Sequence, residues 1–176
     1  MRRMTKIYSD ADACPVIRES LAIARAEKIP CIIAGNTTQN LERHMRPQDP
    51  REPRDPKHPD SSFWTTTLQE SIGADSADFA IASAITPEDI VVTQDIGLAD
   101  IVLGRGARAI GVRGRIYNPL TIDSMMFIRH EEKKVRRQGG RTKGPAPFAN
   151  EDRKRFERNL RQLVHEAKQP QSKSID

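Results

Sequence analysis

Aspartates at three points of the chain are the residues whose type and spacing best suit chemistry. The first point holds Asp10 and Asp12, the second holds Asp75 and Asp78, and the third holds Asp95. Several carboxylates in one pocket cannot all ionise unless a cation lies between them. Mg²⁺ or Mn²⁺, held by carboxylates and water, is the natural occupant of such a pocket. Ions of this kind activate water and stabilise negative charge on a phosphate.

The elements around these acids determine whether they can meet. Asp10 follows a predicted strand over 6–9, and Asp95 follows a predicted buried strand over 90–93. In an open parallel sheet, ligands bind beyond the C-terminal ends of the strands. If the two strands are neighbours, the two acids converge. Asp75 and Asp78 are three residues apart in the first turn of a predicted helix, so their side chains share one face.

Each acid also has a purely structural explanation. An aspartate at a helix N-terminus accepts hydrogen bonds from free N–H groups and favours the helix dipole, which applies to Asp75, Asp78 and Asp95. Asp12 is also suited to an Asx turn. Asp10 is harder to explain this way, because a strand-end carboxylate beside another acid needs a partner. Taken together, the acids predict a site rather than a coincidence of caps.

Apolar residues alternate between strand-like runs and helical spacing along most of the chain, which predicts a doubly wound α/β fold with a parallel sheet. The predicted strands cover 6–9, 29–34, 63–68, 90–93 and 107–112, and the predicted helices cover 15–28, 75–85, 96–104, 121–137 and 150–167. We expect Pro15 to open the first of these helices. We also expect a turn at Gly35-Asn36 and an N-cap at Asn150.

The chain is expected to form one domain over 1–168, followed by a disordered tail over 169–176. A short helix is predicted over 39–45. Prolines at every third position then make 46–60 an exposed inserted loop, because proline cannot support helix or sheet hydrogen bonding.

Charge is unevenly distributed. The net charge is +5, yet the stretch 129–173 holds 14 Lys/Arg against 6 Asp/Glu. A basic region behind an acidic cluster suits a polyanionic partner, while a solvated helical surface is the alternative. No apolar run reaches the roughly 20 residues that span a bilayer, so we expect no membrane association. The basic N-terminus has no apolar segment behind it, which argues against a secretory signal and for a cytoplasmic setting.

The remaining reactive residues give weaker signals. Cys14 follows the first acids and could act as a thiol nucleophile, but a buried structural cysteine fits its context better. The four histidines show no ligand spacing and are interpreted as surface residues. The segment 139–144 lacks the residue order of a P-loop.

Several motifs resemble the YaiI/YqxD family of uncharacterised bacterial proteins. They are Asp10-Ala11-Asp12-Ala13-Cys14-Pro15, Gly73-Ala74-Asp75-Ser76-Ala77-Asp78, Val92-Thr93-Gln94-Asp95-Ile96, Arg113-Gly114-Arg115-Ile116-Tyr117 and Gly139-Gly140-Arg141-Thr142-Lys143-Gly144-Pro145. That family is similar in turn to PIN-like domains, which are metal-dependent nucleases with a three-layer α/β/α sandwich and a mainly parallel sheet. The resemblance implies Asp10, Asp78 and Asp95 as catalytic metal ligands, with Asp12 and Asp75 as auxiliary ligands.

Three functions compete at this point. The first is a Mg²⁺- or Mn²⁺-dependent nuclease acting on RNA, in which Arg113, Arg115, Arg141 and Lys143 hold the nucleic-acid backbone. The second is a haloacid dehalogenase-like phosphatase, since Asp10-Ala11-Asp12 resembles its Asp-x-Asp pair, although Ala13-Cys14 replaces the usual Gly-Thr or Gly-Val. The third is an RNA- or ribonucleoprotein-binding protein without turnover. The third is favoured by the lack of a clear counterpart to the middle-helix glutamate of PIN domains.

Overall fold

The computed structural model describes residues 4–11, 14–36, 63, 65–70, 76–142, 144 and 146–169. The helix predicted over 39–45 and the proline-rich loop predicted over 46–60 lie outside the described residues. The predicted tail also lies outside them from residue 170 onward.

A five-stranded sheet forms the centre of the protein, and its strands follow the order β3-β2-β1-β4-β5. The strands are β1 (Ile7–Asp10), β2 (Cys31–Asn36), β3 (Thr65–Glu70), β4 (Ile90–Val92) and β5 (Arg108–Ile110). All four neighbouring pairs are parallel. β1 lies directly beside β4, with Ser9 opposite Val92. The condition for the convergence of Asp10 and Asp95 is therefore met.

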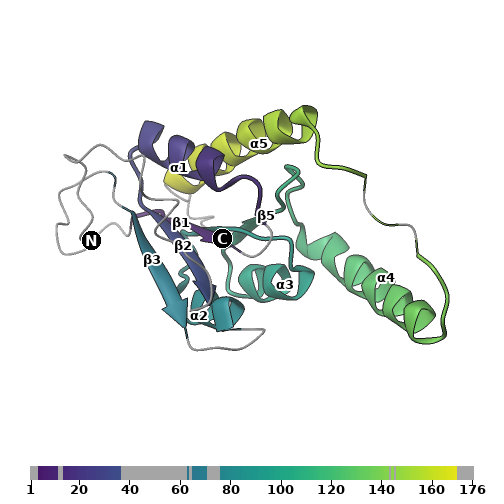
Figure 1. Ribbon diagram of the computed structural model, residues 1–176. Coiled ribbons are helices and arrows are strands. Elements are labelled where there is room, and N and C mark those ends of the chain that lie inside the picture. The colour runs from purple at the N-terminus through teal and green to yellow at the C-terminus, as the bar shows by residue number, and fades with distance from the viewer. Residues whose placement is uncertain are drawn as a thin grey trace, which may run out of the picture.

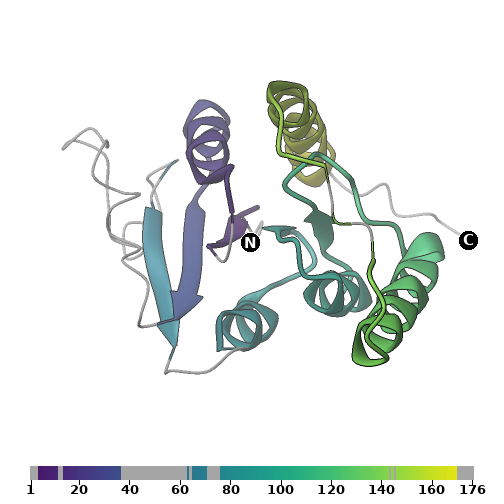
Figure 2. The same cartoon turned by 45° about the vertical axis from the view of Figure 1, so that its right-hand side comes forward.

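Helices cover both faces of this sheet, which confirms the three-layer α/β/α sandwich (Figures 1 and 2). The helices are α1 (Ile17–Ala26), α2 (Ser76–Ala84), α3 (Ile96–Gly104), α4 (Pro119–Arg137) and α5 (Asn150–Lys168). α1 and α5 lie together on one face, and α2 and α3 lie on the other. α4 begins beside α3, and its C-terminal half extends beyond the sheet.

Two apolar clusters fill the space between the layers. One cluster joins α1 and α5 to the sheet, and in it Phe156 and Leu160 are fully buried. The other joins α2 and α3 to the opposite face through residues such as Ile81 and Leu98. Because helices cover both faces of the sheet, β4 consists of three buried apolar residues and not of alternating apolar and polar residues.

Asp89 fixes the start of β4 to the start of β1. Its side chain is 1% exposed, and its carboxylate accepts hydrogen bonds from the Lys6 backbone N–H at 3.1 Å and the Thr86 backbone N–H at 2.8 Å. Burial raises the pKa of Asp89, although these bonds and the nearby Lys6 charge oppose the increase. The contact holds in place the two strands whose ends carry Asp10 and Asp95.

Two local predictions near the start of the chain are wrong. Pro15 lies in a turn, and α1 begins only at Ile17. Gly35 and Asn36 do not form a turn, because they extend β2 and pair with the last two residues of β3. Pairing with the edge strand β3 extends β2 through these two residues, and the local sequence around Gly35 does not indicate this pairing.

The N-cap of the last helix is also shifted by one residue from the prediction. Ala149 occupies the cap position, and Asn150 is the first helical residue. The Asp152 carboxylate accepts a hydrogen bond from the Ala149 backbone N–H at 2.9 Å. An acid in the first turn thus satisfies the N–H group that precedes the helix.

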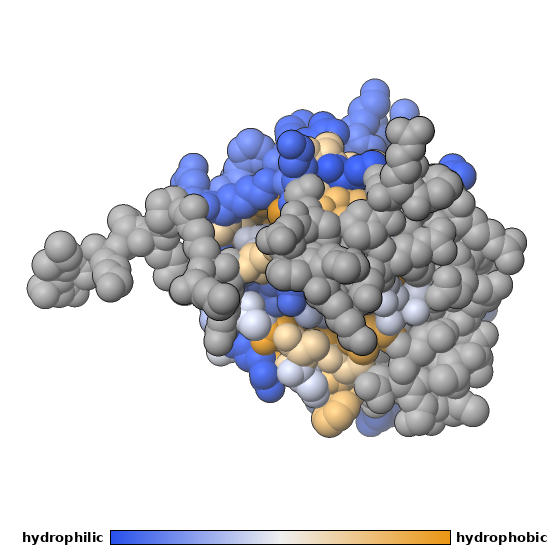
Figure 3. Space-filling model, turned by 90° about the vertical axis from the view of Figure 1, so that its left-hand side faces the viewer, coloured by the Kyte–Doolittle hydropathy of each residue, from blue (hydrophilic) through white to orange (hydrophobic). Residues whose placement is uncertain are grey.

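The surface differs between the two helical layers. Seen from the β3 side, hydrophilic residues cover the α1 and α5 layer, whereas apolar residues are exposed over the α2 layer (Figure 3). Phe79 on α2 is 73% exposed. Within the described part of the chain, no helix has both the length and the apolar character needed to cross a bilayer.

Candidate functional site

Asp10 lies at the C-terminal end of β1 and is 6% exposed. Its Oδ2 atom accepts a hydrogen bond of 3.0 Å from the Thr93 hydroxyl, which follows β4 in the sequence. A carboxylate so little exposed needs such donors, because burial without hydrogen bonds disfavours its charged form. The structure thus brings Asp10 to the end of the neighbouring strand β4.

Thr93 connects the first acid to the third. Its hydroxyl oxygen donates to Asp10 and accepts a hydrogen bond of 3.0 Å from the backbone N–H of Asp95. These two bonds place the Asp10 carboxylate within about 6 Å of the Asp95 backbone nitrogen. The sequence pattern alone did not indicate a role for Thr93. Its position two residues before Asp95 at a strand end was the available signal.

Asp95 caps α3, so the structural explanation for this residue is correct. Its carboxylate accepts hydrogen bonds from the backbone N–H groups of Gly97 at 2.8 Å and Leu98 at 3.4 Å. A side chain at Gly97 would bring its Cβ within 3.2 Å of the Asp95 Oδ1 atom. The small residue therefore leaves room for the cap. Both capping bonds use the Oδ1 atom.

Arg129 on α4 is a site residue that the sequence pattern did not indicate. Its guanidinium donates to the Asp95 Oδ1 atom at 3.1 Å, and both side chains are partly exposed. Arg129 is one of many basic residues on α4, and nothing in its sequence context distinguishes it from the others. Only the packing of α4 against α3 brings it to Asp95.

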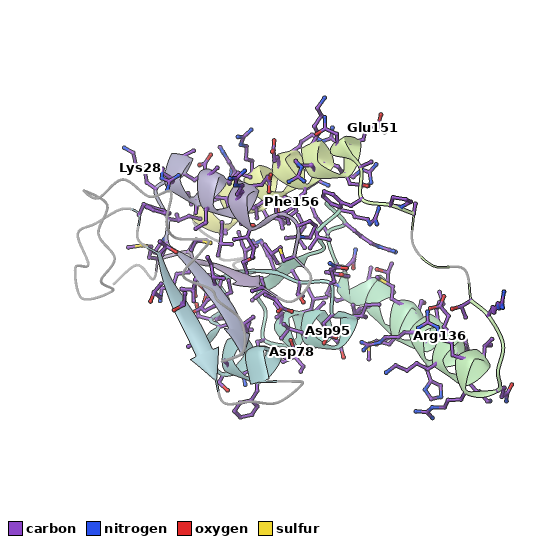
Figure 4. All side chains as sticks on the ribbon, in the orientation of Figure 1. Lys28, Asp78, Asp95, Arg136, Glu151 and Phe156 are labelled. Carbon is purple, nitrogen blue, oxygen red and sulfur yellow. The ribbon has the colours of Figure 1, made fainter. Side chains whose placement is uncertain are left out.

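Asp78 lies in the first turn of α2 and completes the described cluster. Figure 4 labels Asp78 and Asp95 close together, between α2 and α3. Partial burial acts to raise the pKa of Asp95, but hydrogen bonds outweigh it and the pKa is lowered. The first of these bonds joins Asp95 to the Asp78 side chain, followed by those from Gly97 and Arg129. Two carboxyl groups in hydrogen-bond contact must share a proton or have a cation nearby.

The described acids suit a hard cation in type, but they do not form a complete ligand set. Two of the five predicted ligands, Asp12 and Asp75, lie outside the described residues. Among the residues that are described, no group of three or more acidic, histidine or cysteine side chains is arranged to hold a metal ion. The oxygen ligands of Asp10, Asp78 and Asp95 are nevertheless those that Mg²⁺ and Mn²⁺ prefer.

The predicted phosphate-binding residues differ in their surroundings. Arg113 forms an ion pair with Asp152 at 3.0 Å, and its guanidinium lies 5.7 Å from the centre of the Phe148 ring. It also donates to the backbone oxygen of Ala146. Arg115 and Arg141 are exposed, and Lys143 lies outside the described residues. Arg113 thus attaches the segment before α5 to the turn after β5.

Burial disfavours the thiolate form of both cysteines. Burial raises the pKa of Cys14, opposed in part by hydrogen bonds from the Val16 backbone and from Ser9. Burial raises the pKa of Cys31 to about 12. A thiol with a raised pKa is a poor nucleophile at neutral pH. The structural interpretation of Cys14 therefore fits its surroundings.

Comparison with known proteins places these features in a family. Residues 55–166 match the family described as "Uncharacterized BCR, YaiI/YqxD family". The chain is 36% identical over 165 residues to UPF0178 protein CA_C2825 of Clostridium acetobutylicum, which covers 93% of this chain and 99% of the relative. It is 31% identical over 165 residues to UPF0178 protein SH2212 of Staphylococcus haemolyticus, covering 92% of this chain and 98% of the relative.

A third relative, a UPF0178 protein of Exiguobacterium sibiricum, is 33% identical over 161 residues, which are 92% of this chain and 97% of the relative. No solved structure matches the chain. The family match covers more than half of the residues, and the relatives align over almost their whole length. The protein therefore belongs to the YaiI/YqxD family of uncharacterised bacterial proteins.

Proposed function

We propose that the protein is a PIN-like, Mg²⁺- or Mn²⁺-dependent nuclease that cleaves RNA in the bacterial cytoplasm. One observation supports this proposal most strongly. Thr93 bonds both to the Asp10 carboxylate and to the backbone of Asp95, with both distances 3.0 Å. Acids that are 85 residues apart in the sequence thereby share the C-terminal edge of the sheet, where open α/β folds bind ligands.

In this proposal, Asp10, Asp78 and Asp95 hold the metal, and Asp12 and Asp75 assist them. The bound ion would supply an activated water and would stabilise charge on the phosphate. The chain's own contribution is to orient the carboxylates. Thr93 fixes the Asp10 carboxylate, and the α3 cap fixes that of Asp95.

Arg129 has a distinct part in this proposal. As an ion-pair partner of Asp95, it supplies positive charge to the Asp78–Asp95 pair. A metal ion bound by these acids would take over that neutralisation, and the guanidinium would then be available for a phosphate oxygen. We therefore add Arg129 to the predicted phosphate-binding residues, of which Arg115 and Arg141 are exposed.

The test compares Asp10→Asn with a matched control, Asp100→Asn, in which the replaced acid is exposed on α3. Mn²⁺ binding is measured by calorimetry, and cleavage is measured on end-labelled single-stranded RNA with Mg²⁺ or Mn²⁺. Asp10→Asn is expected to weaken Mn²⁺ binding at least tenfold and to abolish cleavage, while Asp100→Asn changes neither. Equal Mn²⁺ binding by the wild type and Asp10→Asn would overturn the proposal.

A second candidate is RNA binding without turnover. It is supported by the lack of a three-ligand cluster among the described residues and by the use of Asp95 as a helix cap and ion-pair partner. Salt-sensitive RNA binding that Asp10→Asn leaves unchanged, with no metal-dependent cleavage, is the result expected of this candidate. The same two assays therefore distinguish the two functions.

A further inference from the structure

α4 exposes an unusual amount of apolar surface. Ile122 is its buried residue, whereas four large apolar side chains of the helix face solvent. They are Leu120 (89% exposed), Phe127 (63%), Ile128 (56%) and Val135 (40%). α4 runs away from the sheet, and Arg136 near its far end lies well outside the sandwich (Figures 1 and 4). The apolar residues are therefore not explained by packing within the described part of the chain.

The four exposed residues share one side of the helix. At about 100° per residue, Leu120, Phe127, Ile128 and Val135 fall within a sector of about 100°. Ile122 and Arg129 fall on the opposite side, and Arg129 reaches Asp95 at the start of α3. α4 thus uses one face for the protein's own interior and presents a second face outward, on which these apolar residues surround Ser124 and Glu131. We call Leu120, Phe127, Ile128 and Val135 the outer face of α4.

The outer face is symmetric along the helix axis. Leu120 lies seven residues before Phe127, and Val135 lies seven residues after Ile128. When two such helices run antiparallel about the midpoint between 127 and 128, Leu120 meets Val135 of the other copy and Phe127 meets Ile128. This self-complementarity is what a two-fold symmetric interface requires. We propose that the protein forms a homodimer through antiparallel packing of the outer faces of α4.

The charged residues beside the outer face support the same arrangement. Asp123 and Lys134 lie along one edge of it, and antiparallel packing brings Asp123 of each copy within one turn of Lys134 of the other. Glu131 lies opposite the Ser124 hydroxyl of the second copy. A parallel arrangement would place this edge against the opposite edge of the second copy, and Asp123 would not meet Lys134. The contact between opposite charges therefore favours the antiparallel orientation.

The same charges argue against a lipid bilayer as the occupant. Helices that bind anionic membranes carry Lys and Arg on both sides of the apolar face. Here Asp123 and Glu131 lie at or within the outer face and would be repelled by anionic headgroups. Two helices of 19 residues each bury less than a standard protein interface, so we expect a weak dimer that forms only at high protein concentration.

The first experiment measures mass by sedimentation equilibrium at protein concentrations from about 5 to 500 µM, a range wide enough to detect a weak dimer. The wild type is expected to shift from monomer to dimer across this range. Ile128→Asp is expected to weaken association at least tenfold. The control is Ile101→Asp, which replaces a 48% exposed isoleucine on α3 and should dimerise like the wild type. Circular dichroism establishes that both variants are folded.

The second experiment tests the orientation by charge exchange. Asp123→Lys alone places like charges at two points of the antiparallel interface and should weaken dimerisation about tenfold. The double variant Asp123→Lys with Lys134→Asp should restore dimerisation to within about threefold of the wild type, because the opposite charges face each other again.

Four outcomes would overturn the proposal. A wild type that stays monomeric at 500 µM has no such interface. A dimer that survives Ile128→Asp uses another surface. Failure of the charge exchange to restore binding refutes the antiparallel arrangement. Binding of the wild type to vesicles of phosphatidylglycerol, lost in Ile128→Asp and without dimerisation, would assign the outer face to membranes instead. None of these measurements depends on nuclease activity.

Discussion

Replacement of Thr93 by valine tests the connection at the centre of the candidate site. Valine has nearly the same shape as threonine, so the change removes the hydroxyl group with little effect on packing. Asp10 would remain 6% exposed but lose a donor at 3.0 Å, and the Asp95 backbone N–H would lose its acceptor at the same distance. Removing one partner of a buried polar pair costs more than the bond itself contributes.

The expected loss can be estimated from these two bonds. A hydrogen bond to a charged group contributes about 1.5–3 kcal/mol, and a neutral bond contributes about 1 kcal/mol. We therefore expect Thr93→Val to lower the free energy of unfolding by about 2–4 kcal/mol. For a domain of this size, that corresponds to a fall in melting temperature of about 5–15 °C. Urea unfolding at neutral pH, followed by circular dichroism, measures the change.

Thr65 provides a matched control in β3. It is 0% exposed, and its hydroxyl has no hydrogen-bond partner among the residues that the structure describes. Thr65→Val removes a buried hydroxyl group that makes no hydrogen bond to the described residues. We therefore expect the free energy of unfolding to be unchanged or to rise by about 1 kcal/mol. The same chemical change should therefore have opposite effects at two buried positions. If Thr93→Val is as stable as the wild type, the two hydrogen bonds of the Thr93 hydroxyl do not stabilise the fold and the reasoning is wrong.

Two further predictions concern backbone and charge. Gly114 has φ +90°, and a Cβ there would lie 2.7 Å from the α5 backbone, so Gly114→Ala should cost more than about 2 kcal/mol in urea unfolding. Gly104→Ala meets no atom within 4 Å and should change stability by less than about 1 kcal/mol in either direction. Asp95 has a lowered pKa in the fold, so near pH 3.8 the unfolded chain binds more protons, and the stability that Asp95 provides at higher pH is lost on acidification. The stability difference between wild type and Asp95→Asn should thus shrink as pH falls from 6 to 3; a constant difference would contradict the assigned shift.

The sequence by itself determined the order and type of the elements. Continuous apolar runs predicted the strands because helices cover both faces of the sheet. Helical spacing over 96–104 predicted α3 with the bounds that the structure shows. These features depend on local periodicity, which is present in a single sequence. The acids at strand ends could be placed on one sheet edge by the same reasoning.

Only the tertiary structure decided which residues complete the site. Nothing near Arg129 in the sequence distinguishes it from the other basic residues of α4, and it gains its role because α4 packs against α3. Thr93 needs the adjacency of β1 and β4 before its hydroxyl can reach Asp10. Arg113, predicted to contact a phosphate, is held by Asp152 from a distant helix. Hydrogen bonds and ion pairs between remote segments depend on distances that only the packed chain sets, and local spacing contains no information about them.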